Sequence, residues 1–467
     1  MAKGHQLKTG QWVFDIVIAY SKRFKSLLLF FHLKFLHYAR RLGILFSLKR
    51  HSINPDSDAL QKLAPRSMSA EPSKLAERLG ISADDPRLPF ALLAQIVRQA
   101  TKIRFVPLRF ADVIGEFALD TEIYLCERKA GLRPDDAMDI FYHSFHLTPN
   151  FCNLHLKEMW ERILPVWPIN QDLIELLTRL PDGSNWTVDT PNPRDHHGIL
   201  LNSHPHLKFL PAEIKRGKST LQALGVPQGK PYVCFHARDS NYDSSMKRYS
   251  RDFTNYRDSD ICQMLPSAEA LTNLGYYVLR VGKVQSAAIR TLNPKIIDYA
   301  ASEYRSDFMD LFLLANCSFF FGGDAGIYAV AEAFRRPYAF VNFPGLHAVH
   351  IWNSSPFIPK HFCSASRRTP LTLSEVLRLE SDGFYLDDSK YAKAGVELIE
   401  NTAEEILDLV LETEARLQGT WRDDECDDVL QKKFWDIYKS HVGSAAGRVF
   451  RTRIGAKFLR QNPGWLQ

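Results

Sequence analysis

Short apolar runs alternate with helical segments between residues 231 and 342, and this alternation constrains the fold more than any other feature of the sequence. The runs are rich in Val, Ile, Phe and Tyr, and they are predicted as strands at 231–236, 276–281, 296–300, 318–321 and 338–342. Helices are predicted between them, at 260–274, 308–315 and 327–334. Strands that alternate with helices form a mostly parallel sheet covered on both faces. The segment therefore predicts a nucleotide-binding α/β layout.

A less regular alternation precedes this segment and predicts a first α/β domain over residues 90–215. Its strands are predicted at 103–108, 122–126 and 139–143, and its helices at 91–100, 111–120, 154–163 and 171–180. Downstream, residues 346–370 show no clear period and are predicted as a loop. Helices are predicted to follow at 371–379 and 402–417.

Local signals indicate where two of the later helices begin. Ser259 and Asp260 are good N-caps for the helix at 260–274, and Asp307 is one for the helix at 308–315. Pro266 falls inside the first of these helices. We expect it either to kink that helix or to mark its true start.

The positive charge is concentrated at the start of the chain. The net charge is +6, and residues 1–52 hold ten Lys/Arg and one acid, so this segment carries +9 and the remainder −3. A body with no basic excess argues against a nucleic-acid partner. The apolar run at 26–37 is interrupted by His32 and Lys34, and a membrane span needs about 20 apolar residues.

Basic residues flank that run on both sides, as in a helix that lies in the headgroup layer of an anionic membrane. We therefore expect residues 1–50 to form a basic amphipathic head that contacts the membrane surface. The alternative is a helix packed on the protein body. The tail beyond Phe434, with Arg448, Arg451, Arg453, Lys457 and Arg460, is a second candidate for lipid contact.

Seven cysteines are present, without a CxxC pair and without the Cys/His spacing of a zinc site. Several lie in apolar runs, as Cys234 does. This usage is typical of reduced, buried thiols in a cytoplasmic protein. No metal site is expected.

The run His236-Ala237-Arg238-Asp239 follows a strand predicted to be buried. Ligands of open α/β sheets bind beyond the carboxyl ends of the strands. A guanidinium matches phosphate oxygens and keeps its charge at every relevant pH, so Arg238 is suited to neutralise a leaving diphosphate. The alternative is a structural ion pair between Arg238 and Asp239.

The run Gly322-Gly323-Asp324-Ala325-Gly326 joins a predicted strand to a predicted helix. Its glycines permit a tight turn and close approach of a ligand, and free N–H groups at a helix start favour a phosphate. The spacing matches neither GxGxxG nor the P-loop. The alternative is plain turn chemistry with Asp324 as the N-cap.

Other polar residues are expected at the same edge of the sheet. Arg280 and Gly282 end the second strand, and Asp298 and Tyr299 close the third, where they could meet a base, ribose or phosphate. Residues 258–260 spell Asp-Ser-Asp, a pattern that some transferases use for a metal ion. Here helix capping explains it better, because the triplet precedes a helix.

The runs 233–242, 256–261, 274–282 and 296–300 resemble a family of bacterial glycosyltransferases found among surface-polysaccharide genes. That family is distantly similar to fucosyltransferases of the GT-B type, which carry a His-x-Arg motif. The resemblance extends from about Arg109 to Arg460 and leaves the first 85 residues out.

The resemblance implies an α/β, GT-B-like fold in which two Rossmann-like domains face a cleft. Five segments are then expected: the basic head 1–50, a linker 51–89, an acceptor-side domain 90–215, a donor-binding domain 216–370 and C-terminal helices 371–467. Arg238 matches the arginine that holds the donor diphosphate in the fucosyltransferases. Asp324 and Ala325 depart from the Thr or Ser that precedes the glycine in relatives, so Asp324 is expected to serve through its backbone N–H.

In the first domain, relatives carry Gly followed by His where Gly115 and Glu116 stand here. Glu116 is then a candidate base on the acceptor side. The alternative is that Glu116 is a surface acid on the first helix. The predicted catalytic residues are Arg238, Asp239, His236 and Glu116, with Asp239 as the first candidate for the base. The predicted donor-binding residues are Arg238, Gly282, Asp298, Tyr299, Gly323, Asp324, Ala325, Gly326 and Gly115.

The function that we expect is an inverting, metal-independent glycosyltransferase of the hexosyl or fucosyl type. Its donor would be a nucleotide sugar, with GDP as one candidate nucleotide, and no separate cofactor is expected. The acceptor would be a glycan or lipid-linked sugar of surface polysaccharide synthesis, at the cytoplasmic face of the inner membrane. Two alternatives remain: a nucleotide-sugar 2-epimerase and a non-catalytic, membrane-associated scaffold.

Overall fold

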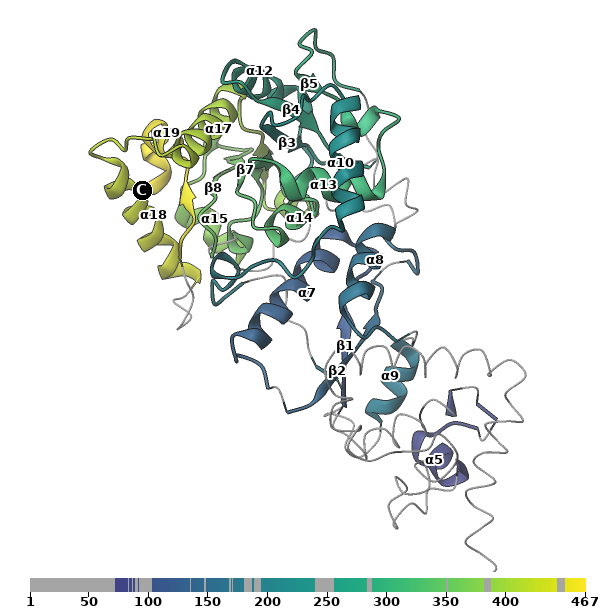
Figure 1. Cartoon of the computed structure of the whole chain (residues 1–467). Coiled ribbons are helices and arrows are strands. Elements are labelled where there is room, and N and C mark those ends of the chain that lie inside the picture. Colours follow the sequence, from purple (N-terminus) through teal and green to yellow (C-terminus); the bar gives the residue numbers. More distant parts are fainter. Residues whose placement is uncertain are drawn as a thin grey trace, which may run out of the picture. The chain divides into compact units, whose positions relative to one another are not determined.

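A computed structural model describes the chain from residue 72 onwards, with gaps (Figure 1). The described residues are 72–82, 84–85, 87–88, 91, 103–134, 136–146, 148–167, 169, 171–179, 187–188, 195–239, 256–283, 288–349, 352–381, 388–442 and 450–467. The basic head 1–50, most of the linker and most of the helix predicted at 91–100 lie outside them.

The chain divides into two compact units. The first combines Met1–Phe105 with Asp136–Ile140 and Ile169–Thr187, and the second holds the rest. The first unit contains α5 (Pro72–Leu79) and α9 (Gln171–Thr178). Within it, Arg104 contacts Asp139 at 2.9 Å. The site residues predicted from the sequence all belong to the second unit.

A seven-stranded parallel sheet forms the centre of the second unit. The strand order is β12-β8-β7-β6-β3-β4-β5. The bounds are β3 Tyr232–His236, β4 Tyr277–Arg280, β5 Ile296–Ile297, β6 Phe320–Gly322, β7 Tyr338–Phe343, β8 Pro356–Pro359 and β12 Arg453–Ile454. The chain enters at β3, builds outward to β5, and returns to β6 on the other side of β3. This order is the doubly wound order of the Rossmann fold.

Helices pack against both faces of this sheet (Figure 1). Right-handed crossovers place the β3–β4 and β6–β7 connections on opposite faces, because the two halves grow in opposite directions. On one face α12 (Leu265–Asn273) contacts α17 (Ala403–Leu417), and on the other α13 (Asp307–Asn316) contacts α14 (Tyr328–Ala333). Strands covered on both faces are apolar throughout, and Val233, Cys234 and Phe235 are accordingly fully buried.

The first α/β part has a small sheet of its own. It pairs β1 (Ile103–Leu108) with β2 (Met138–His143). The helices α7 (Ile114–Lys129), α8 (Leu154–Ile163) and α10 (Pro211–Ala223) follow in chain order, and α10 runs across the boundary predicted at 215/216. The helix α7 packs on α14 of the doubly wound part. The predicted α/β class is confirmed, with a doubly wound parallel sheet in the second unit.

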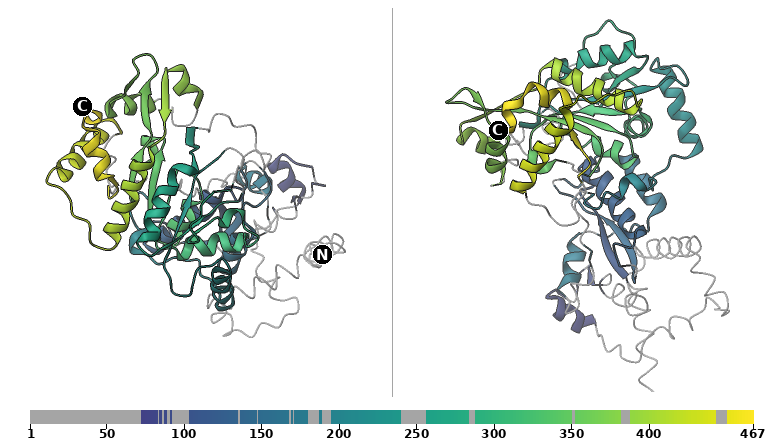
Figure 2. Two further views of the ribbon diagram at one scale, coloured as in Figure 1. Left: turned by 90° about the horizontal axis from the view of Figure 1, so that it is seen from above. Right: turned by 90° about the vertical axis from the view of Figure 1, so that its left-hand side faces the viewer.

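The segment after β7 completes the doubly wound part. A three-stranded antiparallel sheet joins β9 (His361–Ser364), β10 (Thr369–Pro370) and β11 (Val396–Ile399). The helices α15 (Leu373–Glu380), α16 (Asp388–Lys393), α18 (Asp427–Val442) and α19 (Ala456–Gln461) accompany it. Figure 2 shows the C-terminus beside α18 and α19.

Two predictions of secondary structure were wrong. Residues 122–126 belong to the long helix α7, and not to a strand. This helix is buried on nearly all sides, so its sequence lacks the polar stripe that signals a helix. The predicted loop 346–370 contains β8, β9 and β10. Their prolines and short lengths concealed them, since proline in a run argues against a strand.

The helix starts were predicted in part. Asp260 caps a short 3-10 helix, Ile261–Met264, by accepting from the Cys262 N–H at 2.8 Å. The α-helix α12 begins only afterwards, with Pro266 in its first turn, so the proline marks a true start. Ser306, and not Asp307, caps α13 by accepting from the Met309 N–H at 3.2 Å.

Three of the described basic residues of the tail are engaged with acids. Arg453 contacts Asp428, Lys457 contacts Asp408 and Arg460 contacts Asp427, at 3.5, 2.8 and 3.0 Å. Three of the tail's cations therefore already have acidic partners, while Arg451 is exposed. In the described part of the chain, none of the helices has the length and apolar character to cross a membrane.

Candidate functional site

The strand order places the topological switch point, where folds of this kind have their ligand crevice, at the carboxyl ends of β3 and β6. These two strands are neighbours, and their connections leave in opposite directions. Doubly wound sheets bind their ligands at this switch point. In the register, His236 at the end of β3 lies opposite Gly322 at the end of β6. The two runs singled out in the sequence therefore meet at the position where such a fold holds its ligand.

The glycine turn after β6 is closely packed. A Cβ on Gly322 would lie 2.3 Å from the carbonyl oxygen of His236, so no other residue fits there without backbone movement. A Cβ on Gly323 would lie 3.2 Å from the Ser259 hydroxyl oxygen. The Ala325 N–H donates to the Gly323 carbonyl at 2.9 Å, which closes the turn.

Arg238 lies in a polar nest just beyond β3. Its side chain is largely buried, and its Nη1 donates to Oδ1 of Asp258. The Asp258 carbonyl in turn accepts from Nζ of Lys360 at 2.7 Å. Burial raises the pKa of Asp258, and the guanidinium of Arg238 opposes this effect. Arg238 thus forms an ion pair with Asp258, 20 residues later in the chain.

Ser259 is a site residue that the sequence analysis missed. Its backbone N–H donates to the Arg238 carbonyl at 3.1 Å, which holds it at the crevice. Its hydroxyl is buried beside Gly323 and has no hydrogen-bond partner among the described residues. Capping was the right interpretation for Asp260, but it concealed the roles of the two residues before it. The sequence signal was the Asp-Ser-Asp triplet itself.

His236 ends β3 as a neutral imidazole. Its Nδ1 lies 2.8 Å from the carbonyl oxygen of Val281, and we assign the donor hydrogen to Nδ1 on this basis. Burial lowers the pKa of His236 to about 4. The ring is therefore uncharged at neutral pH, and its Nε2 is a weak base.

The residues after β4 and β5 have mainly structural contacts. Arg280 Nη1 lies 3.3 Å from Asp298 Oδ2, which also accepts from the Ile289 N–H at 2.9 Å. Tyr299 is fully buried, and its hydroxyl donates to Asp310 at 2.8 Å. Gly282 has a φ of 144°, so it ends β4 in a conformation that favours glycine. Arg280 pairs with Phe235 of β3 in the register, which keeps this edge next to the crevice.

The start of α7 reaches the same turn. A Cβ on Gly115 would lie 3.2 Å from the Cα of Gly326, so the two glycines allow close packing. Glu116 follows Gly115 and is half-buried. Burial raises the pKa of Glu116, Arg257 and Arg109 oppose this effect, and Asp324 adds to it. The structure therefore brings Gly115 against the glycine turn, with Glu116 next to it in the chain.

Asp324 and Asp239 occupy the flanks of the crevice. Asp324 Oδ2 lies 4.0 Å from Arg257 Nη1, and its side chain is 26% exposed. This contact turns the carboxylate towards a cation. Asp239 is half-buried and directly follows Arg238. Because α14 has only six residues, its dipole is smaller than expected for the helix predicted at 327–334.

One group of possible metal ligands lies away from the crevice, within the described residues. Glu122, Cys126 and His206 bring their ligand atoms within 4.8 Å of one another. Nη2 of Arg335 lies 2.7 Å from Glu122 Oε1 and 3.3 Å from Cys126 Sγ. The guanidinium fills the place that a cation would take, so these residues fit an ion pair better than a metal.

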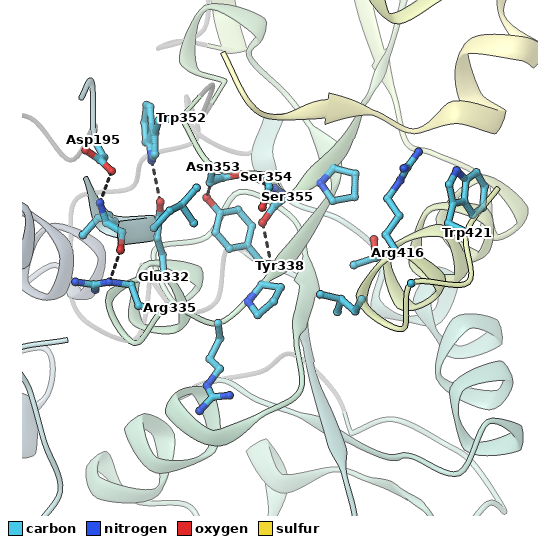
Figure 3. Close-up of a pocket in the computed structure, with 18 of the residues that line it drawn as sticks. Asp195, Glu332, Arg335, Tyr338, Trp352, Asn353, Ser354, Ser355, Arg416 and Trp421 are labelled. Atoms are coloured by element: carbon cyan, nitrogen blue, oxygen red, sulfur yellow. Dashed lines mark hydrogen bonds between the residues drawn. The ribbon is translucent and has the colours of Figure 1, made fainter. Parts of the chain in front are cut away.

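A cavity of about 460 Å³ opens at the opposite, amino edge of the sheet. Figure 3 shows Glu332 and Trp352 on one side of it and Arg416 and Trp421 on the other, with Tyr338 at the start of β7 between them. The cavity does not coincide with the switch point between β3 and β6. We place the candidate site at the switch point, because the carboxyl edge is where sheets of this kind bind ligands.

No protein-family model matches the sequence, and no curated protein is similar to it in sequence. Among solved structures, the chain is similar to a glycosyl transferase of family 9 from Veillonella parvula DSM 2008. The identity is 11% and the TM-score 0.39, over 67% of this chain and 97% of that one.

It is also similar to the ADP-heptose lipopolysaccharide heptosyltransferase II of E. coli, with 12% identity and a TM-score of 0.29, over 51% of this chain and 84% of that one. A third similar structure is the iron-containing dodecameric glycosyltransferase TibC of enterotoxigenic E. coli, with 10% identity and a TM-score of 0.29, over 55% and 62% of the two chains. Similarities at this level carry no weight for function, which has to be inferred from the site.

Proposed function

We propose that this chain is a glycosyltransferase that moves a sugar from a nucleotide-diphosphate donor to a glycan or lipid-linked acceptor. The observation that carries the proposal is the meeting of Arg238 and the glycine turn at the switch point of a doubly wound sheet. A cation and close-packed backbone N–H groups are the partners that a diphosphate requires.

Arg238 would hold the donor diphosphate and stabilise the charge that develops as it leaves. Positioned positive charge of this kind is the largest catalytic contribution in many enzymes. The Gly323 and Asp324 N–H groups and the Ser259 hydroxyl would contact the same phosphates. For the diphosphate to bind Arg238, Asp258 has to share the guanidinium, which offers five N–H donors.

The reaction would proceed by a single displacement. The acceptor oxygen bonds to the anomeric carbon, while the bond from that carbon to the diphosphate oxygen breaks and leaves its electron pair on the diphosphate. The acceptor hydroxyl proton passes to a carboxylate of the enzyme. Glu116 is the base that the geometry favours, because it lies at the glycine turn. Asp239 is the second candidate, and His236 is the weakest because of its low pKa.

The finer points of the proposal follow the resemblance to GT-B enzymes. They are a GDP-linked hexosyl or fucosyl donor, catalysis without a metal ion, and an acceptor of surface polysaccharide synthesis. A cytoplasmic enzyme held at the inner membrane by its basic head would meet a lipid-linked acceptor directly. Residues 1–50 would provide that contact.

A thermal-shift screen against GDP, UDP, ADP and CMP tests the proposal. A ligand at about 100 times its Kd should raise stability by about 2.7 kcal/mol. One nucleoside diphosphate should shift the wild type and leave Arg238→Ala unshifted. Arg238→Lys should retain part of the shift, because it keeps the charge and loses the fork of donors.

The matched control is Arg453→Ala, which removes an arginine whose ion pairs lie at β12 and α18. It should bind the nucleotide as the wild type does. A screen in which no nucleotide shifts the wild type would contradict the proposal and favour the scaffold. Turnover of the donor without an acceptor would favour the 2-epimerase.

A further inference from the structure

The helix α7 carries two carboxyl groups on one face. Glu116 and Asp120 are four residues apart, so their side chains lie one above the other along the helix. Glu116 is in the first turn, beside the crevice, and is half-buried. Asp120 lies one turn deeper and is fully buried.

Asp120 lacks the partners that a buried carboxylate requires. Neither of its oxygens has a hydrogen-bond partner among the described residues. The cation that contacts it is Arg109, whose Nη1 lies 3.6 Å from Oδ2, beyond hydrogen-bond distance. Burial of an ionised carboxylate without hydrogen bonds is costly, and such a group takes up a proton instead.

Four other groups act electrostatically on this pair. Arg109, from the loop before α7, acts on both carboxyl groups. Arg257 and Asp324, from the far side of the crevice, act on Glu116. The buried phenol of Tyr328, on α14, senses both acids. The two cations favour charge on the outer carboxyl group, Glu116, more than on the inner one, because only Arg109 reaches Asp120.

Burial raises the pKa of both groups, and the effect is greater for Asp120, where the neighbouring Glu116 adds to it. A charge on Glu116 disfavours a second charge on Asp120 one helical turn away, and this repulsion adds to the effect of burial on Asp120. A single proton then resides on the carboxyl group whose surroundings stabilise a negative charge less. By burial and hydrogen bonding, that group is Asp120.

We propose that Asp120 is a positioning residue for Glu116: it keeps the proton of the pair, so that Glu116 stands at the crevice as the carboxylate that accepts the acceptor's proton. The catalytic half of this inference rests on the proposed function. The pairing itself is a property of the protein without substrate, and it can be measured independently.

Isotope-edited infrared titration of the full-length protein tests the pairing. Labelling the aspartate carboxyl carbon with ¹³C separates the aspartic acid band from those of Glu332 and Glu380, two other buried acids. The wild type should show a protonated aspartic acid at neutral pH that is missing in Asp120→Asn. Asp120→Leu has no carboxyl group and should lose the same band. It replaces the asparagine variant in the test if that variant folds poorly.

The decisive variant is Glu116→Gln, which removes the outer charge and leaves Asp120 in place. If the two groups are coupled, the aspartic acid band should titrate at lower pH in this variant, by about one pH unit or more. A purely structural Asp120 would titrate at the same pH with and without Glu116. That result, or an aspartic acid spectrum that Asp120→Asn leaves unchanged, would overturn the inference.

The stability of the protein gives a second readout. A buried acid whose folded pKa is raised destabilises the fold increasingly as pH rises above its unfolded value of about 3.9. Asp120→Asn should therefore gain stability relative to the wild type as pH rises from about 4 to 8. A constant difference would contradict the inference. The nucleotide screen decides the transferase function separately, so the two failures are distinguishable.

Discussion

Gly115 and Gly326 lie against each other although 211 residues separate them: a Cβ on Gly115 would be 3.2 Å from the Cα of Gly326, and one on Gly326 would be 3.1 Å from the Gly115 nitrogen. This contact sets the distance between the start of α7 and the glycine turn. It therefore positions Glu116 relative to Arg238, the two residues at the centre of the proposed mechanism.

Gly115→Ala and Gly326→Ala should each lower stability by about 1–3 kcal/mol, the usual cost of forcing an extra carbon into a packed contact. The reason is that the neighbouring atoms are backbone atoms and have little freedom to move. Urea unfolding measures the change. Gly464→Ala is the control, because the atom nearest to its Cβ is 3.9 Å away. Equal stability of all three variants would show that α7 and the turn are not in contact.

Arg238→Ala should lower kcat by about 10²–10³, as for the loss of one strong electrostatic contact to the transition state. The variant also leaves Asp258 without its guanidinium, so folding should be checked by circular dichroism. Asp258→Asn keeps Arg238 and should retain more activity. The assay is release of the nucleotide identified by thermal shift. Near-normal turnover of Arg238→Ala would refute the assignment.

Glu332 should make stability depend on pH near neutrality. Burial raises its pKa from the ordinary value of 4.5 to about 7. A raised acid pKa means that the folded state holds the proton more tightly, so stability is greatest below the unfolded pKa. The free energy of unfolding should fall by up to about 1.4 kcal/mol per pH unit between the unfolded and the folded pKa of Glu332.

Glu332→Gln should flatten this part of the stability profile, measured by urea unfolding between about pH 4 and 8. The amide oxygen still accepts from Trp352 Nε1, which lies 2.8 Å from Glu332 Oε1. Glu404→Gln, at an exposed position, should leave the profile unchanged. A profile that Glu332→Gln does not alter would show that Glu332 titrates as it does in the unfolded chain.

His206 should stabilise the fold as a cation. The Cys126 sulfur and the Glu122 carboxylate beside its ring raise the pKa of His206 to about 9. This stabilisation is fully present below the unfolded value of about 6.5 and is lost as pH rises through about 9. His206→Gln should therefore be destabilised at neutral pH and approach the wild type at alkaline pH.

Thermal unfolding at a series of pH values would measure this convergence. His441→Gln, an exchange on α18 far along the chain, is the control. A His206→Gln variant with the same deficit at every pH would mean that the ring contributes by packing and not by charge.

The strands of the doubly wound part could be predicted because burial on both faces leaves a continuous apolar signature. Tyr232–His236 and Tyr338–Phe343 are examples. α7 could not be predicted as one helix for the same reason: it is buried nearly all round, and a run such as 122–126 then has the composition of a strand. The strands β8 to β10 are two to four residues long, below the length at which alternation can be detected.

The candidate site was predictable to the extent that it lies on consecutive residues. The runs at 236–239 and 322–326 follow strands and were found from the sequence. The partners contributed by other segments were not. Asp258 pairs with Arg238 and Asp120 lies beneath Glu116 only because the fold brings them there. Tyr299 was predicted as a donor-binding residue because it is polar and follows a strand. In the structure its hydroxyl contacts Ser306 and Asp310, and it holds the loop before α13 together.

The order of strands in the sheet also bears on how the chain reaches its fold. β3 needs β6 as a neighbour, and the paired residues Cys234 and Phe320 are far apart in the sequence. β8 is covered by β12 at Arg453–Ile454. Pairings of high sequence separation are slow to form, because the entropy of closing a long loop is lost first. Between the synthesis of Pro359 and that of Ile454, β8 lacks its partner β12 and is an exposed edge, so the nascent chain is open to edge-to-edge aggregation over that interval.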